Sequence, residues 1–202
     1  MEQETLYTAA KWDILKSLAK SKKAPIELAE EANTSVSNIS QSLRFLELAG
    51  LIKSERLSNR DKGKPRVMYS LAKDIAYIIV TSQGFVQKKQ LDLDIRKKIY
   101  LKIWLFENKN THRFLEKAIE GIEKDLSNYE GIFLDLTNLV DVRLKLVLKP
   151  AQKSDHKDFS FTHNGVSKKI KYQVSSWDDI NKETQNYYSI HDPLSNYKGE
   201  IK

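Results

Sequence analysis

The spacing of apolar positions in the first twenty residues predicts an amphipathic helix. Apolar residues recur every four positions from Leu6 to Leu18, and Trp12 and Leu15 widen the stripe. This period places them on one helical face, which a core can bury. A short second helix is predicted from Pro25, because proline suits a first helical position where its missing N–H has no partner anyway. Its apolar positions are Ile26, Leu28, Ala29 and Ala32.

A third helix is predicted between a polar turn and a glycine. Asn33-Thr34-Ser35 interrupts the apolar pattern and supplies residue types that cap helix N-termini. Gly50 is the type of residue that ends a helix in a left-handed conformation. Between them, one face is expected to be apolar and buried, at Val36, Ile39, Leu43 and Leu46.

After Gly50 the period changes to that of short strands. Residues 51–57 and 66–71 are predicted to form two strands, joined by the polar loop SNRDKGKP. The predicted order is therefore helix, helix, three-residue turn, helix and β-hairpin. This order is typical of a winged helix-turn-helix.

The remainder of the chain predicts a mixture of helices and strands. We expect a helix around 75–82, and a mainly helical stretch over 91–127 that breaks near 107–111. Alternation predicts strands at 132–136 and 142–148, then a hairpin with its turn at His163-Asn164-Gly165. A last helix should begin near Trp177, capped by Ser176.

These patterns predict an α+β chain of two domains. Residues 1–80 would form an N-terminal winged helix-turn-helix, and residues 81–202 a helical connector followed by a small C-terminal mixed α+β domain. The amphipathic helices between Leu91 and Leu126 are the candidates for a surface shared between two copies.

Positive charge is concentrated in the predicted hairpin. The chain has a net charge of +7, and residues 50–73 contain seven Lys or Arg against two acidic residues. Such a basic segment favours a polyanionic partner. The sequence contains no cysteine, and its four histidines lie far apart. We therefore expect no metal site, no cofactor and no cysteine nucleophile. No apolar run reaches the length of about 20 residues that spans a bilayer, so a cytoplasmic protein is expected.

The polar face of the third helix is suited to reading DNA. In a helix-turn-helix the second helix enters the major groove, where Asn and Gln pair with adenine and Arg pairs with guanine. Basic side chains of the hairpin, or wing (52–71), can contact phosphates or the minor groove. The candidate contacts to double-stranded DNA, in the recognition helix (35–49) and in the wing, are Ser35, Ser37, Asn38, Ser40, Gln41, Arg44, Lys53, Arg56, Arg60, Lys62, Lys64 and Arg66.

The same segment resembles the winged helix of ArsR-type regulators, especially archaeal members. The resemblance is carried by Leu28-Ala29-Glu30, the turn 33–37, the helix end 43–52 and the wing 63–71. It covers about 70 of the 202 residues. It implies a DNA-binding transcription regulator, commonly a homodimer on a two-fold operator. Metal-sensing relatives use cysteine or clustered histidine ligands, which this sequence lacks, so the metal-sensor role does not carry over.

The C-terminal half leaves an enzymatic alternative open. Its order of elements resembles a degenerate minimal nucleotidyltransferase domain, which needs a Gly-Ser pair and an Asp-x-Asp motif to hold magnesium. Here the Gly-Ser pair is absent and Arg143 replaces the second carboxylate of a motif beginning at Asp141. Asp135 and Asp141 are therefore interpreted as turn and strand-end residues, and no enzymatic activity is expected.

Two further possibilities for this half are a protein-interaction module and an RNA-binding surface. Trp104, Phe106, Phe114, Trp177, Tyr187 and Tyr188 could contact a partner, although core packing accounts for most large aromatic residues. RNA binding would use aromatic residues on a sheet, but Phe159, Phe161 and Tyr172 alternate as core residues do. The C-terminal half is therefore expected to serve dimerisation or effector binding, and the sequence identifies no effector.

Overall fold

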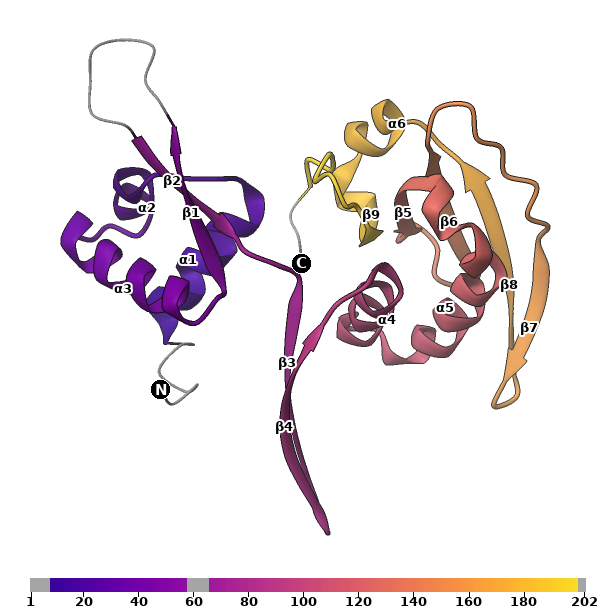
Figure 1. Ribbon diagram of the computed structural model, residues 1–202. Helices are drawn as coiled ribbons and strands as arrows, with labels where there is room; N and C mark the ends of the chain where they lie inside the picture. Colours follow the sequence, from indigo (N-terminus) through magenta and orange to yellow (C-terminus); the bar gives the residue numbers. More distant parts are fainter. Residues whose placement is uncertain (1–7, 58–65, 200–202) are drawn as a thin grey trace. The chain divides into compact units, whose positions relative to one another are not determined.

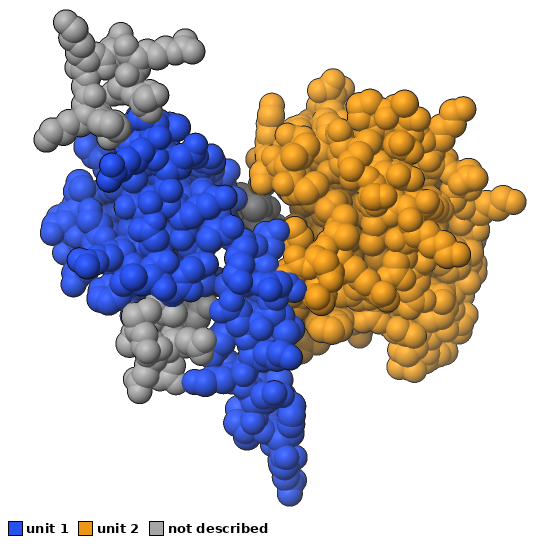
Figure 2. Space-filling view, viewed as in Figure 1, with its two compact units in different colours: residues 1–92 blue, residues 93–202 orange. Residues whose placement is uncertain are grey.

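The chain folds as two compact units, which are coloured separately in Figure 2. The computed structural model describes residues 8–57 and 66–199. Helices and strands occur in both units, as expected for an α+β protein. The division falls between Asp92 and Leu93. The boundary predicted at residues 80 and 81 lies instead within a strand, and each unit is described separately below.

The first unit begins with the predicted helix-turn-helix and hairpin (Figure 1). Strands β1 and β2 pair antiparallel, with Ile52 opposite Leu71 and Leu57 opposite Arg66. The core packs Ile14 and Leu18 against apolar residues of the next two helices and of the hairpin. The elements are α1 (Ala9–Lys20), α2 (Pro25–Glu31), α3 (Val36–Leu48), β1 (Ile52–Leu57) and β2 (Arg66–Leu71).

The ends of α2 and α3 are fixed by the residues that the sequence indicated. Pro25 occupies the first turn of α2, where Glu27 Oε2 accepts a hydrogen bond of 2.6 Å from the backbone N–H of Ala24. Ser35 Oγ caps α3 by accepting from the backbone N–H of Asn38 at 3.2 Å. Gly50 follows α3 with φ at +70°, a conformation that a side chain would strain.

Several apolar residues on the predicted buried faces are exposed. Val36, in the first turn of α3, is 44% exposed, and Trp12 on α1 is 49% exposed. Ile39, Leu43 and Leu46 are buried as predicted. Val36 is not among the residues that pack in the core of the first unit.

The helix predicted around 75–82 is wrong. Ile75–Ser82 forms strand β3, which pairs antiparallel with β4 (Phe85–Asp92) through a turn containing Gly84 at φ +79°. Ile78, Ile79, Val80 and Thr81 are β-branched, and such side chains lose less conformational freedom in a strand than in a helix. The run lacks the strict apolar–polar alternation that is typical of a half-buried strand.

The second unit contains a five-stranded sheet of order β7-β8-β6-β5-β9. β6 runs parallel to β8, and the other neighbouring pairs are antiparallel. The elements are α4 (Ile95–Leu105), α5 (Lys109–Ile122), the 3-10 helix η2 (Glu123–Asn128), β5 (Tyr129–Asp135), β6 (Val142–Leu148), β7 (Phe159–His163), β8 (Val166–Val174), α6 (Trp177–Lys182), the 3-10 helix η3 (Thr184–Asn186) and β9 (Tyr187–His191).

Helices cover both faces of this sheet (Figure 1). On one face, α4 and α5 pack Ile99, Ile103 and Ile119 onto residues of β5, β6, β8 and β9. On the other face, Phe133 of β5 packs with Ile180 of α6. The helices predicted as a connector therefore bury their apolar stripe in the core of their own unit. No helix of the described segments is long and apolar enough to cross a membrane.

Candidate nucleic-acid interface

The outward face of α3 presents polar side chains that are suited to base recognition. Ser37, Gln41 and Arg44 are exposed, at spacings of four and three residues that place them on one helical face. The opposite face is fixed, because Leu43 and Leu46 are fully buried. Core packing therefore holds α3 in one rotational setting and turns these donors and acceptors to solvent. Asn38 and Ser40 are also exposed and flank that face.

Hydrogen bonds at the start of α3 orient two of the predicted contact residues. Ser35 uses its hydroxyl oxygen to cap the helix, so its hydroxyl proton is still available to a phosphate or base acceptor. Asn38 donates from Nδ2 to Thr34 Oγ1 at 3.3 Å. This bond leaves the carbonyl oxygen of the Asn38 amide as an acceptor. The sequence predicted Asn38 as a contact residue and Thr34 only as a candidate helix cap, whereas the structure shows that Thr34 also positions Asn38.

The only carboxylate on α3, that of Glu47, is engaged within the protein. Its Oε1 accepts hydrogen bonds from the Ser54 backbone N–H at 3.1 Å and from Ser54 Oγ at 2.6 Å. These bonds link the end of α3 to β1. The Glu47 carboxylate is therefore held against β1.

The basic residues of the wing differ in their surroundings. Lys53 and Arg56 are exposed on β1. Arg66, at the start of β2, donates from Nη2 to Glu27 Oε1 at 2.9 Å, so its charge is partly neutralised within the protein. Arg60, Lys62 and Lys64 lie outside the described residues. Of the wing candidates that are described, Lys53 and Arg56 are therefore the stronger ones.

Exposed apolar residues on α3 were not identified as candidates from the sequence. Leu48 is exposed and shares the helical face of Gln41 and Arg44, and Phe45 is exposed beside it. The Lys11 ammonium lies 5.5 Å from the centre of the Phe45 ring. Helical spacing from Arg44 would have found Leu48, whose side chain can contact a thymine methyl group.

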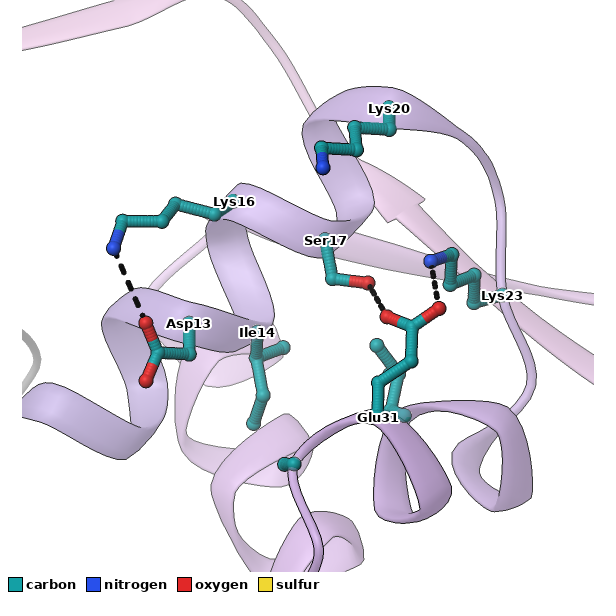
Figure 3. Close-up of a pocket in the computed structure, with 9 residues that line it drawn as sticks. Asp13, Ile14, Lys16, Ser17, Lys20, Lys23 and Glu31 are labelled. Carbon is teal, nitrogen blue, oxygen red and sulfur yellow. Dashed lines mark hydrogen bonds and ion pairs between the residues drawn. The ribbon is translucent and has the colours of Figure 1, made fainter. Parts of the chain in front are cut away.

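A cavity of about 410 Å³ lies between α1 and α2 (Figure 3). Most of its polar lining residues pair with one another: Ser17 Oγ donates to Glu31 Oε2 at 2.5 Å, Lys23 pairs with the other Glu31 oxygen, and Lys16 pairs with Asp13. The hydrogen bonds from Lys23 and Ser17 lower the pKa of Glu31. This cluster ties α1 to α2 and to the segment before α2, which fixes the bracing helices relative to each other.

The carboxylates considered for an enzymatic site in the second unit have structural partners. Asp135 ends β5 and accepts from the Thr137 backbone N–H at 2.9 Å and from Thr137 Oγ1 at 2.6 Å. Asp141 pairs with Lys171 at 2.8 Å, and this hydrogen bond lowers the pKa of Asp141. Both residues therefore act at a turn and a strand end, as interpreted from the sequence. Among the described residues, no group of three or more His, Asp or Glu side chains could hold a metal ion.

Fold and surface define the first unit as a winged helix-turn-helix, a class of DNA-binding domain. Residues 10–54 match the sequence model of the arsR family of bacterial regulatory proteins. The match covers α1, α2, α3 and the start of β1, so the N-terminal part of the chain carries an ArsR-type helix-turn-helix. It leaves the rest of the chain unassigned. No curated protein matches the sequence.

Proposed function

We propose that the protein is a sequence-specific transcription regulator that binds double-stranded DNA. The recognition helix (35–49) would lie in the major groove, and the wing (52–71) would contact the backbone or the minor groove. The observation that carries this proposal is the division of α3 into a buried apolar face and an exposed face bearing Ser37, Gln41 and Arg44. A helix with this division, braced by α1 and α2, meets the requirements of major-groove reading.

The charge distribution supports the assignment of roles. Affinity for DNA comes largely from contacts with phosphates, whereas specificity comes from contacts with base edges. Lys53 and Arg56 lie on the strand that follows α3, so they can contact phosphates while α3 contacts bases. Ser35 and Ser40 would contact a phosphate or a base at the edge of the same groove.

Two copies of the chain would act together. A single recognition helix reads only a few base pairs, which is too little information to select one site among roughly 10⁶ or more competing sites. A two-fold homodimer doubles the site length and requires half-sites about one helical turn, or a multiple of it, apart. The second unit would serve dimerisation or the binding of an effector, without enzymatic activity.

Genome-wide mapping of the DNA bound by the full chain tests this function. We expect discrete sites that share a sequence motif, and purified protein should bind them more tightly than unrelated duplexes at the same salt concentration. Because phosphate contacts release counterions, the affinity should fall as salt rises. Absence of discrete sites, together with salt-independent binding in vitro, would contradict the proposal.

A further inference from the structure

The hairpin formed by β3 and β4 lacks the packing that normally stabilises a two-stranded sheet. The two strands pair over eight residues each, from Ile75–Asp92 to Ser82–Phe85. No third strand joins them among the described residues. Ile75, at the base, packs against the core of the first unit, whereas the distal half is exposed on both strands. An isolated hairpin of this kind is only marginally stable in water.

The distal half of the hairpin also exposes large apolar side chains. Ile79 is 63% exposed, and Val80, Phe85 and Val86 are exposed as well. A long, exposed, apolar edge strand offers a row of backbone groups to any other strand, and proteins usually protect such edges with charges or proline. β3 has no charged residue and no proline between Ile75 and Ser82. Its edge is therefore unprotected.

We propose that β3 pairs antiparallel with β3 of a second copy of the chain, forming a four-stranded sheet of order β4-β3-β3-β4. This inference rests on the proposed function only for the need for two copies. The interface itself follows from the exposure and the charges of the β3–β4 hairpin. It would be isologous, because each copy contributes the same strand to a two-fold axis.

The charges of the two strands select the β3 edge and favour a second copy as the partner. β4 carries Lys88 and Lys89, whose charges would face lysines of the copy if two β4 edges met. Like charges close together across paired strands are destabilising. β3 brings no charge to its own copy, so its pairing has no such cost. A charged strand of another protein would find no opposite charge to pair with on β3.

The exposed part of β3 indicates the register. Residues 79–82 are exposed, and Ile78 is the last half-buried residue before them. Antiparallel pairing of 78–82 with its copy is centred on Val80, which places the two Val80 side chains opposite each other at the axis. Facing Cα atoms in such a pair are about 4.5–5.5 Å apart. Ile79 of each copy would lie opposite Thr81 of the other, and Ile78 opposite Ser82, so β-branched residues meet at the three central positions of the segment.

A matched pair of lysine substitutions tests the interface. Val80 and Gln87 face each other within the hairpin, so their side chains lie on the same side of the sheet. Val80→Lys would place two ammonium groups together at the two-fold axis, whereas Gln87→Lys adds the same charge one strand farther out. At tens of micromolar, sedimentation of the wild type and Gln87→Lys should give twice the chain mass of 23.4 kDa. Val80→Lys should give the monomer mass.

Cross-linking tests the register without changing any charge. The chain has no cysteine, so a single introduced cysteine can form a disulfide only with the same cysteine of a second copy. Val80→Cys should oxidise to a covalent dimer, because a disulfide requires Cα atoms less than about 7 Å apart. Gln87→Cys should not, since the two copies of that position lie three strand spacings, or about 14 Å, apart.

The outcomes separate this inference from the proposed function. A monomeric wild type, a dimeric Val80→Lys protein, a monomeric Gln87→Lys protein or equal cross-linking at both cysteines would each overturn β3 pairing. DNA binding is measured on the same samples. Retention of site-specific binding by a monomeric wild type would overturn only the interface, whereas a dimer without DNA binding would overturn only the proposed function.

Discussion

Arg66 Nη2 and Glu27 Oε1 lie 2.9 Å apart and join the start of β2 to α2. The other oxygen of the same carboxylate accepts a hydrogen bond from the Ala24 backbone N–H. Glu27 therefore both caps α2 and positions strand β2 of the wing. Both side chains of the pair are substantially exposed, so the ion pair contributes little to stability by itself. The two wing arginines differ in this respect, because Arg66 pairs with Glu27, whereas no ion pair of Arg56 is found within the part of the chain that the structure describes.

The two arginines should therefore differ in their contribution to DNA binding. Arg56→Gln should lower affinity for all duplexes about equally and reduce the slope of log K against log salt by about 0.9, the value for one phosphate contact. Arg66→Gln should change the slope by less. Binding titrations of both variants over a range of salt concentrations measure this difference, and a larger loss of slope at Arg66 would contradict the interpretation.

Substitution of two leucines on α3 tests whether core packing fixes the orientation of this helix about its axis. Leu43 is fully buried and Leu48 is 72% exposed. Leu43→Ala should destabilise the first unit by about 2–5 kcal/mol, the usual cost of truncating a buried leucine. Leu48→Ala, the matched control, should change stability by no more than about 0.5 kcal/mol.

Hydrogen exchange of the α3 amides in the full chain measures this effect where it arises. Exchange should become faster in Leu43→Ala and stay unchanged in Leu48→Ala. Equal exchange in the two variants would mean that α3 is not held by its Leu43 face.

His191 should make the stability of the second unit depend on pH. The side chain is buried at the end of β9, and its burial, together with the nearby Lys102 and Lys98, lowers its pKa to about 4. Lys149 acts in the same direction and Asp192 opposes it. The unfolded chain binds a proton at the ordinary histidine pKa of about 6.5, whereas the folded chain does not until about pH 4. Stability should therefore fall as the pH drops from 6.5 to 4 and change no further below that range.

The size of this effect is at most about 3 kcal/mol, at 1.36 kcal/mol for each pKa unit. Denaturation curves of the wild type and His191→Gln between pH 7 and 4 measure it as the difference in slope. The variant should lose this part of the pH dependence, and His163→Gln serves as the control. Identical pH dependence in the wild type and His191→Gln would contradict the assignment.

The second unit should show no nucleotidyl transfer. Purified protein incubated with magnesium and labelled nucleoside triphosphates should transfer label neither to itself nor to RNA or another protein. The reason is that Asp135 and Asp141 are held by Thr137 and by Lys171. Transfer that disappeared in Asp135→Asn or Asp141→Asn would overturn this expectation.

The elements that the sequence predicted correctly are those in which local signals and the fold agree. Pro25, Ser35 and Gly50 mark the ends of α2 and α3, and the alternation in 142–148 and the turn at Asn164-Gly165 gave β6 and the β7–β8 hairpin. Capping and turn residues act through hydrogen bonds and backbone angles that depend on few neighbours. These features can therefore be read without knowledge of tertiary structure.

The elements that the sequence did not give depend on contacts distant along the chain. The parallel pairing of β6 with β8 joins segments that are separated by β7, and β9 pairs with β5 from the far end of the chain. β3 has an apolar pattern that fits a buried helix as well as a strand, and only its pairing with β4 decides between them. The pairing of Arg66 with Glu27 likewise joins residues 39 positions apart.

Selection of bound duplexes from a random pool tests whether α3 reads base sequence. The full chain should enrich a defined motif, and so should Gln87→Ala as a control on β4. The double variant Gln41→Ala, Arg44→Ala should remain folded and still bind duplex DNA. It should lose preference at the base pairs that these side chains contact, at a cost of about 1–3 kcal/mol for each bidentate contact. Enrichment of the unchanged motif by the double variant, or of no motif by the wild type, would contradict the claim.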